Sequence, residues 1–455
     1  MIHQIKKLIP NAWLDIYHKI LAKISAFWYG HPSEKLIVIG VTGTNGKTTT
    51  AYLIAKALEA EGGKTGCASS ALFKVADREW LNETKMTMLG RFGLQKLLKQ
   101  MVDAGCKYAV IETSSQGIVQ HRHEQVAYDI GVFTNLTPEH IEAHGGFENY
   151  KQAKIKLFKH IVELPLKVID WQRVPHAAIL NRDDEHAADF AVPGMQEVIW
   201  YGLGQGSEVK AEHIQESASG VEFKVDGIDV KLHLMGRVNI YNALPALAVA
   251  KILRVDLRQA IAKLGEIKNM PGRFERIEEG QPWQVIVDYA PEPASLSKLY
   301  ETVKVLQPKR IIHVLGSCGG GRDVARRPIL GSMAAQNAQI VIVTNEDPYD
   351  DDPMQIIEQV AEGARHPVRI SNLESRISGT GHEKKDNQDL FLILDRRQAI
   401  QKAMDLAQAG DLVILTGKGS EQRICVANGK KLPWDEREAA RQAIRQTIAE
   451  RTQRA

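Results

Sequence analysis

The chain has 455 residues, of which 44% are hydrophobic and 25% are charged, and its formal net charge at pH 7 is +3. This length allows about two to four domains with ample buried core. The near-neutral charge, without a dense run of lysine and arginine, argues against an extended nucleic-acid-binding surface. Four widely spaced cysteines form no C-x-x-C pair and so indicate neither a zinc ribbon nor a disulfide framework. With no stretch of transmembrane length and no signal-peptide pattern, we expect a cytoplasmic protein.

The first 34 residues predict an amphipathic helix that begins at Asn11. Its apolar residues recur at helical spacing, with lysines at other positions. They are Trp13, Ile16, Tyr17, Ile20, Leu21, Ile24, Phe27 and Trp28. Two interpretations stay open: a helix docked on the following domain, and a helix at a membrane surface, which its tryptophan, tyrosine and lysine content suggests.

The next segment predicts a strand, a phosphate loop and a helix. Leu36–Ile39 is an apolar run, a glycine-rich turn follows, and an apolar-periodic pattern starts at Lys47. Backbone N–H groups of such a turn ring a polyphosphate, Lys47 reaches the outer phosphates, and the Thr48 hydroxyl ligates Mg²⁺. The strict pattern is missed by one position, since Val41 stands where the first glycine is expected. The residues assigned to this site are Gly43, Thr44, Asn45, Gly46, Lys47, Thr48 and Thr49.

The rest of the chain alternates strand and helix patterns, which predicts an α/β fold. Strands at 108–111 and 130–135 belong to a first, mostly parallel sheet, and Pro271-Gly272 interrupts the pattern. Beyond it, strands at 284–288, 310–315, 340–344, 390–394 and 412–415 predict a second, Rossmann-like doubly wound domain, with a polar surface loop at 371–389. We therefore expect an N-terminal helix (1–34), a central P-loop ATPase domain (35–271) and a C-terminal domain (272–455).

A series of short motifs carries a family resemblance. In order they are GTNGKT at 43–48, ETSS at 112–115, NLTPEH at 135–140, YKQAK at 150–154, NRDD at 181–184, NIYN at 239–242, MPGRFE at 270–275, DYA at 288–290 and GKGSE at 417–421. Together they resemble the Mur ligase family, and most of all its MurE branch, over about residues 35 to 440. Those enzymes add the third amino acid of the peptidoglycan stem peptide to UDP-N-acetylmuramoyl-L-alanyl-D-glutamate.

The resemblance implies an ATP-dependent amide-forming reaction. A carboxylate attacks the γ-phosphate of ATP, and an incoming amine displaces phosphate from the acyl phosphate; the approach of two anions calls for Mg²⁺ and cationic donors. Lys47 and Thr48 match the ATP site, Glu112 and His140 match ligands of a second Mg²⁺, and Lys154 matches a carbamylated lysine, so that Lys47, Lys154 and His140 are the candidate catalytic residues. A rim carboxylate, a core histidine and a surface lysine are the alternative interpretations of Glu112, His140 and Lys154.

The resemblance also implies contacts for the acceptor and the nucleotide. Ser114, Gln120 and Arg122 match the loop that holds the nucleotide-sugar peptide, with Thr87 a further contact at a place where the family shows two threonines. The matching nucleotide contacts are Asn239, Asn242, Arg273 and Asp288.

The amino-acid site departs from the family pattern. Diaminopimelate-adding members carry Asp-Asn-Pro-Arg, and here the matching residues are Glu346-Asp347-Pro348-Tyr349. The arginine that grips the far carboxylate of the substrate is thus replaced by Tyr349. Acids such as Asp347 favour a cationic side chain, such as that of lysine or ornithine, unless they are simply solvated. Gly417 and Glu421 match the end of the site that holds the incoming amino group.

Before the phosphate loop, 34 residues are too few for the N-terminal domain with which MurE proteins hold UDP. We expect reduced UDP recognition, a partner that supplies it, or a different acceptor, including a lipid-linked one met through a peripheral membrane contact of the N-terminal helix. The alternatives to a peptidoglycan ligase are a folylpolyglutamate synthetase-like enzyme and a non-catalytic ATP-binding subunit. We expect a monomer that uses a nucleotide-sugar peptide and a free amino acid, and no nucleic acid.

Overall fold

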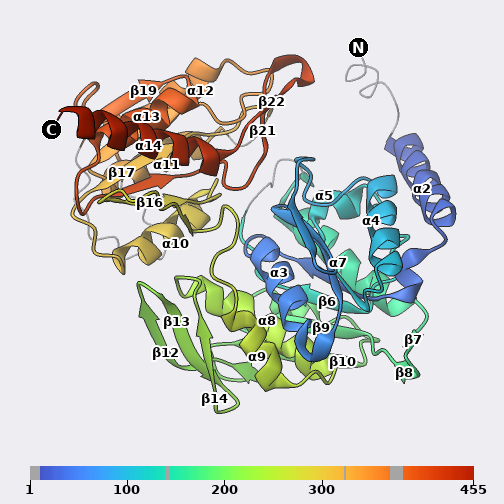
Figure 1. The fold of residues 1–455 in the computed structure, drawn as a ribbon. Helices are drawn as coiled ribbons and strands as arrows, with labels where there is room; N and C mark the ends of the chain where they lie inside the picture. The colour runs from blue at the N-terminus through green and yellow to red at the C-terminus, as the bar shows by residue number, and fades with distance from the viewer. Residues whose placement is uncertain (1–10, 139–143, 322–323, 369–382, 455) are drawn as a thin grey trace. The chain divides into compact units, whose positions relative to one another are not determined.

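The computed structural model describes residues 11–138, 144–321, 324–368 and 383–454 (Figure 1). The chain divides into two compact units. The N-terminal unit comprises Met1–Gln215, Val221–Leu232 and Arg237–Ile267, and the C-terminal unit comprises Glu216–Gly220, His233–Gly236 and Lys268–Ala455. The domain limits expected from the sequence stay predictions, and each unit is described by itself.

A mostly parallel sheet forms the centre of the N-terminal unit. In the described residues its strand order is β11-β10-β9-β6-β1-β5-β2-β3-β4, and only β3 and β4 run antiparallel to their neighbours. The strands are β1 (Ile37–Thr42), β2 (Thr65–Ala68), β3 (Leu72–Val75), β4 (Arg78–Leu81), β5 (Tyr108–Glu112), β6 (Ile130–Phe133), β9 (Ala177–Asn181), β10 (Glu197–Gly202) and β11 (Val209–Lys210).

The helices of this unit cover the sheet. Val38 packs in a core cluster with residues of α4 and α7, while α3 packs against β1 and β5. Every residue of β1 is buried, as expected for a central parallel strand covered on both faces. The described α-helices are α2 (Asn11–Trp28), α3 (Lys47–Ala57), α4 (Arg91–Asp103), α5 (Ser115–Val119), α7 (Phe147–Glu163), α8 (Val238–Ile252) and α9 (Leu257–Gly265).

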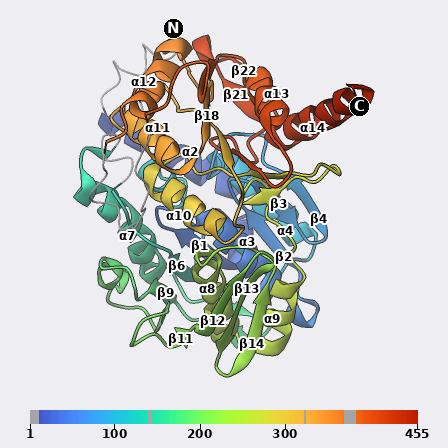
Figure 2. The ribbon, with the colours of Figure 1, turned by 90° about the vertical axis from the view of Figure 1, so that its left-hand side faces the viewer.

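Antiparallel pieces extend this unit beyond what the sequence predicted. The β2, β3 and β4 strands lie side by side at one edge of the sheet (Figure 2). Further pairs are β7 (Val168–Ile169) with β8 (Gln172–Arg173), and β12 (Glu212–Ser217) with β13 (Gly220–Val225) and β14 (Ile228–Leu232). These strands are short and several are exposed, so their sequences lack the apolar runs that reveal a buried parallel strand.

The C-terminal unit contains a second sheet, in the order β15-β16-β20-β17-β18-β19 in the described residues. All pairs are parallel except β15 with β16. Val285 and Ile286 are consecutive but belong to different core clusters, so both faces of the sheet are covered by helices. The expected α/β class with parallel sheets is confirmed.

The strands of the C-terminal unit are β15 (Glu275–Arg276), β16 (Gln284–Val287), β17 (Ile311–Leu315), β18 (Ile340–Thr344), β19 (Leu390–Ile393), β20 (Leu412–Leu415), β21 (Arg423–Cys425) and β22 (Lys431–Pro433). Its α-helices in the described residues are α10 (Pro293–Lys304), α11 (Arg326–Asn337), α12 (Pro353–Arg365), α13 (Arg396–Leu406) and α14 (Glu436–Arg454). Much of the surface loop expected at 371–389 lies outside the described residues.

Candidate functional site

The phosphate loop connects β1 to α3 and has no room for side chains at two glycines. A Cβ on Gly43, whose φ is +146°, would lie 2.0 Å from the Thr134 hydroxyl oxygen. A Cβ on Gly46, which caps α3 with a φ of +82°, would lie 2.5 Å from the Asn242 side-chain oxygen. The positive φ and the close neighbours both require glycine here. The loop therefore presents its backbone at the N-terminus of α3, the arrangement that binds phosphate.

Asn135, which lies just after the neighbouring strand β6, fixes the shape of this loop. The Thr44 N–H donates to the Asn135 carbonyl at 2.8 Å, and the Asn45 N–H donates to the Asn135 side-chain oxygen at 2.9 Å. The Asn135 amide donates in return to the Asn45 carbonyl at 3.0 Å. Within the loop, Lys47 Nζ donates to the Thr44 carbonyl at 2.5 Å, so the ammonium lies over the loop where the outer phosphates of a bound nucleotide are expected.

Two oxygen ligands suited to Mg²⁺ lie side by side next to the loop. The Thr48 hydroxyl donates to Glu112 Oε2 at 3.0 Å, and the Ser70 N–H donates to the same oxygen at 2.6 Å. Glu112 is the last residue of β5, which pairs with β1, and it is only 2% exposed. A buried carboxylate beside a hydroxyl fits a hard, oxygen-preferring cation. His140, which the sequence assigns with Glu112 to a second Mg²⁺, lies outside the described residues.

Lys154 is buried beside the phosphate loop, so the interpretation as a surface lysine is wrong. It lies on α7 and is 1% exposed. Its Nζ donates to the Gly43 carbonyl at 2.7 Å and lies 4.2 Å from the ring centroid of Tyr150. The Tyr150 hydroxyl in turn shares a hydrogen bond with the Thr44 hydroxyl, 3.2 Å away. Lys154 therefore belongs to the same constellation as the loop, in agreement with its predicted place.

The predicted nucleotide residues of α8 also meet the loop. Thr50 donates to the Asn242 side-chain oxygen at 3.3 Å, and the Asn242 amide donates to the Asn239 side-chain oxygen at 2.9 Å. Since the same Asn242 oxygen faces Gly46, α8 is held against the N-terminal turn of α3. The structure thus brings residues almost 200 positions apart in sequence to one side of the loop.

The predicted acceptor loop follows β5 directly and is internally ordered. Ser114 caps the short helix α5 by accepting from the Gly117 N–H at 3.1 Å. Arg122 donates to the Gln120 side-chain oxygen at 2.6 Å and also to the Met88 carbonyl, which places the segment of Thr87 next to this loop. Burial lowers the pKa of Arg122. Gln120 and Arg122 thus contact each other, Arg122 also contacts the residue after Thr87, and the role of all four as acceptor contacts stays a prediction.

Sequence reasoning missed His144 in this region. Its Nε2 shares a hydrogen bond with the Ser115 hydroxyl at 3.1 Å and lies 3.4 Å from the Gln116 amide nitrogen. Burial and the nearby Lys154 lower the pKa of His144, so its neutral form is favoured. The signal that could have found it is its position just after the motif at 135–140.

In the C-terminal unit, the predicted Arg273 and Asp288 hold one turn. Asp288 accepts from the Phe274 N–H at 2.6 Å and from the Ala290 N–H at 2.8 Å, and the Arg273 guanidinium lies 4.6 Å from the ring centroid of Tyr289. Burial raises the pKa of Asp288. Asp288 therefore shapes the backbone on which Arg273 is presented.

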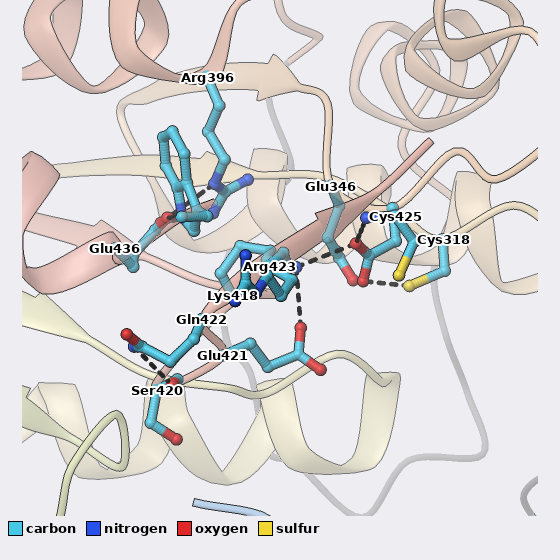
Figure 3. A network of polar contacts seen from close by, with 12 residues as sticks. Cys318, Glu346, Arg396, Lys418, Ser420, Glu421, Gln422, Arg423, Cys425 and Glu436 are labelled. Atoms are coloured by element: carbon cyan, nitrogen blue, oxygen red, sulfur yellow. Dashed lines mark hydrogen bonds and ion pairs between the residues drawn. The ribbon is translucent and has the colours of Figure 1, made fainter. Parts of the chain in front are cut away.

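The predicted amino-acid residues of this unit meet at a lysine that sequence reasoning did not select (Figure 3). Lys418 Nζ donates to Asp347 Oδ1 at 3.1 Å, to Glu421 Oε2 at 2.8 Å and to the Arg423 carbonyl at 2.8 Å, and it is fully buried. It lies inside the motif at 417–421, which was the available signal. The three neighbours of this ammonium fix the position of Glu421 relative to the loop of Asp347.

Close packing surrounds this network. A Cβ on Gly417, whose φ is +99°, would lie 2.3 Å from Glu346 Oε2. Glu346 Oε1 accepts from the Cys318 thiol at 2.9 Å, and the Tyr349 N–H donates to the Cys425 carbonyl at 3.1 Å. Glu346 and Asp347 are both buried, so the interpretation of these two acids as solvated surface charges is wrong.

Two family models match the chain. "Mur ligase middle domain" matches residues 41–250, and "Mur ligase, glutamate ligase domain" matches residues 272–419. This chain belongs to the Mur ligase family. Mur ligases are ATP-dependent enzymes that form amide bonds and generally require Mg²⁺, so the expected ligase chemistry is confirmed at the level of the family.

Curated relatives and solved structures agree with this assignment. The chain is 37% identical over 444 residues to a UDP-N-acetylmuramyl-tripeptide synthetase of Roseiflexus sp. (strain RS-1), covering 96% of this chain and 83% of the relative. It is 34% identical over 444 residues to a UDP-N-acetylmuramoyl-L-alanyl-D-glutamate–2,6-diaminopimelate ligase of Geobacillus kaustophilus (strain HTA426), covering 96% of this chain and 85% of that one. A solved structure of such a diaminopimelate ligase has a TM-score of 0.57 at 28% identity, covering 91% of this chain and 79% of its own.

A folylpolyglutamate synthase of Mycobacterium tuberculosis superposes with a TM-score of 0.65, covering 88% of this chain and 92% of its own. At 17% identity this likeness shows the shared fold alone.

Proposed function

We propose that the protein joins an amino acid to a UDP-N-acetylmuramoyl-dipeptide-like acceptor during peptidoglycan precursor synthesis. The observation that carries the proposal is the constellation of Lys47, Thr48, Glu112 and Lys154 around the phosphate loop, with the acceptor loop starting two residues after Glu112. A loop that holds phosphates next to a loop that holds a carboxylic acid suits the formation of an acyl phosphate. The proposed setting is the cytoplasm, with the protein acting as a monomer.

Each side chain has a defined task in this reaction. The loop N–H groups and Lys47 bind and orient the phosphates of ATP, which offsets the charge that builds up on them during transfer. Ser114, Gln120, Arg122 and Thr87 hold the acceptor so that its carboxylate faces the γ-phosphate. Thr48 would hold one Mg²⁺ and Glu112 with His140 a second, and these ions would neutralise the phosphate and carboxylate oxygens. Asn239, Asn242, Arg273 and Asp288 complete the nucleotide contacts.

We further propose that Lys154 is carbamylated. An unmodified ammonium would repel a metal ion held at Glu112, whereas a carbamate is an anion that helps to hold it. The burial of Lys154 and its contact with the loop carbonyl of Gly43 support this proposal, because the N–H of a carbamate can still donate to that carbonyl. Labelling with ¹³C-bicarbonate should give a carbamate carbonyl resonance that is lost in Lys154→Ala and kept in Lys156→Ala; no such resonance would refute the modification.

The incoming amino acid is proposed to carry a cationic side chain, as lysine and ornithine do. Among the buried side chains around Lys418, two are cations, Lys418 and Arg396, and three are carboxylates, Glu346, Asp347 and Glu436. Arg396 pairs with Glu436 at 2.6 Å, and Lys418 pairs with Asp347 and with the partly exposed Glu421. Glu346 accepts from the Cys318 thiol and is one carboxylate more than the two buried cations, although it also interacts electrostatically with Arg396. This excess carboxylate, together with the replacement of the family's arginine by Tyr349, favours a cation over a second carboxylate.

The test is phosphate release from ATP with UDP-N-acetylmuramoyl-L-alanyl-D-glutamate and single amino acids. Release that requires both the acceptor and lysine or ornithine, and that disappears in Lys47→Ala, is the expected result. Release with diaminopimelate instead would keep the ligase and refute the cationic site. Release that occurs only with another acid, such as a folate or a lipid-linked acceptor, would refute the proposed acceptor.

A variant sharpens the amino-acid assignment. Glu346→Gln removes the excess charge without changing the shape of the side chain. We expect the KM for the cationic amino acid to rise about tenfold, in line with the loss of one charge-assisted contact, while the KM for ATP stays the same. An unchanged KM for the amino acid would place its side chain elsewhere.

A further inference from the structure

Helix α2 (Asn11–Trp28) buries small residues and exposes most of the large apolar residues whose side chains the structure describes. It packs on α4 of the N-terminal unit (Figure 1). Among the α2 residues whose side chains the structure describes, the buried ones are Ala22, Ser25 and Ala26. A helix that docks on a globular core normally buries its large apolar side chains instead. The docking of α2 on its own chain, one of the two interpretations from the sequence, therefore leaves its large apolar face unused.

That outward face is broad, continuous and rich in aromatic residues. Its exposed members are Trp13 (69%), Ile16, Tyr17, Ile20, Ile24, Phe27 (79%) and Trp28 (75%). At about 100° per residue these positions span an arc of roughly 120° on one side of the helix. Helices that lie at a membrane surface have an apolar face of about this width. Tryptophan and tyrosine are enriched at the boundary between the apolar and aqueous phases.

Basic charge is concentrated at the same end of the chain. Residues 1–30 contain Lys6, Lys7, Lys19 and Lys23 against the single acid Asp15, a net charge of +3 that equals the net charge of the whole chain. The other 425 residues are therefore formally neutral. Lys19 and Lys23 are exposed, and their helical positions lie on one border of the apolar arc. Lys19 forms an exposed ion pair with Asp15 at 3.1 Å, which leaves it accessible to an anionic surface. This charge is complementary to an anionic lipid surface, which attracts each nearby lysine.

We propose that α2 is an interfacial anchor that binds the surface of an anionic lipid bilayer, with its aromatic face in the headgroup region. The helix would lie in the plane of the surface, since no helix in the described part of the chain is long and apolar enough to cross a membrane.

The anchor is joined to the acceptor loop. His121 contacts Asp15 of α2 through Nε2 and shares a hydrogen bond of 2.5 Å with Glu124 Oε1 through Nδ1. His121 stands between Gln120 and Arg122, two of the proposed acceptor contacts. Bilayer binding by α2 would therefore hold the acceptor loop near the lipid surface.

The experiment is vesicle flotation of the full-length chain, which needs no activity readout. Vesicles contain phosphatidylcholine alone or with 30 mol% phosphatidylglycerol. We expect the protein to float with the anionic vesicles and about tenfold less with the neutral ones, and to be released by high salt. Absence of flotation with anionic vesicles would overturn the proposal.

Matched variants identify the surface. Trp13→Ser/Phe27→Ser/Trp28→Ser should reduce flotation at least tenfold, while Trp171→Ser, which removes an equally apolar and fully exposed side chain in the turn between β7 and β8, should not. Lys19→Glu/Lys23→Glu should reduce binding to anionic vesicles alone. Equal flotation of the triple variant and the wild type would overturn the proposal, as would a wild-type dimer that the triple variant converts to a monomer without any lipid binding.

Discussion

The proposed binding sites of the two units use different chemistry. In the N-terminal unit, the backbone of two glycines and neutral side chains such as Asn135 and Asn242 hold the loop in a conformation suited to binding phosphate. In the C-terminal unit, buried charges centred on Lys418 and Arg396 hold the site. Phosphate has the same geometry in every nucleotide, so a fixed backbone suffices for it. An amino-acid side chain must be distinguished from others, which charged groups do by pairing or repulsion.

The largest effect is expected at the phosphate loop. Lys47→Ala should lower kcat/KM on the order of 10³-fold, because a preorganised cation that faces developing phosphate charge is lost. Lys64→Ala, at an exposed lysine of the same unit, should leave kcat/KM within about twofold. Steady-state phosphate release measures both. Equal losses in the two variants would mean that Lys47 has no special position.

In the C-terminal unit, replacing the central lysine of the buried charge network should lower the stability of the fold. Lys418→Met leaves Asp347 buried without its cation and should lower the free energy of unfolding by about 3–5 kcal/mol. The control is Arg445→Met, which removes an ion pair with Glu279 whose arginine is 60% exposed and should leave the free energy of unfolding nearly unchanged, because water screens exposed pairs. Chemical denaturation compares them. A small effect of Lys418→Met would show that the buried network is not needed for stability.

Each unit contains a buried neutral histidine, and both histidines predict the same pH dependence of the free energy of unfolding. Burial lowers the pKa of His123 in the N-terminal unit and of His313 in the C-terminal unit to about 3. The unfolded chain takes up a proton on each below pH 6.5 while the folded chain does not, so stability is complete above pH 6.5 and falls as the pH drops from there toward 3. The slope is about 1.4 kcal/mol per pH unit for each histidine.

Denaturation of the wild type at pH 7 and pH 5 measures this loss. His313→Gln should remove the contribution of the C-terminal unit, about 2 kcal/mol over this interval. A wild-type slope retained in the variant would assign the pH dependence to other groups.

A smaller effect is expected from a change in the backbone of the phosphate loop, and it tests whether this backbone is needed for ATP binding. Gly43→Ala places a Cβ 2.0 Å from the Thr134 hydroxyl and should weaken ATP binding at least tenfold. Gly227→Ala has a similar left-handed strain, at φ +75°, but no atom within 4 Å of the new Cβ. It should cost about 1 kcal/mol of stability and leave ATP binding unchanged. Calorimetric titration with ATP distinguishes the two outcomes.

The sequence predicted the strands that are buried in parallel sheets, for example β18 at residues 340–344. A run of four or five apolar residues bounded by polar ones is typical of a strand that is covered on both faces. It did not predict β3 and β4 or β12 to β14. β3 and β4 have only four residues each and β12 is largely exposed, so none of these three strands carries a long apolar run. β13 alternates buried and less buried residues, a pattern weaker than the continuous run of a central parallel strand.

The candidate site shows the same division. Lys47 and Thr48 could be placed from sequence because a phosphate loop is a local structure. Lys418 and His144 could not, since their roles depend on partners that are distant in sequence: Asp347 is 71 residues away, and Ser115 is 29 residues away.

The sequence by itself determined the α/β class, the phosphate loop and the family, because each is written in short contiguous patterns. Only the tertiary structure decided that Lys154 is buried against the Gly43 carbonyl, that Glu346 and Asp347 are not solvated, and that α2 turns its aromatic face outward. The reason is physical. Local backbone geometry follows from neighbours in the chain, whereas burial and charge pairing depend on which distant segments pack together.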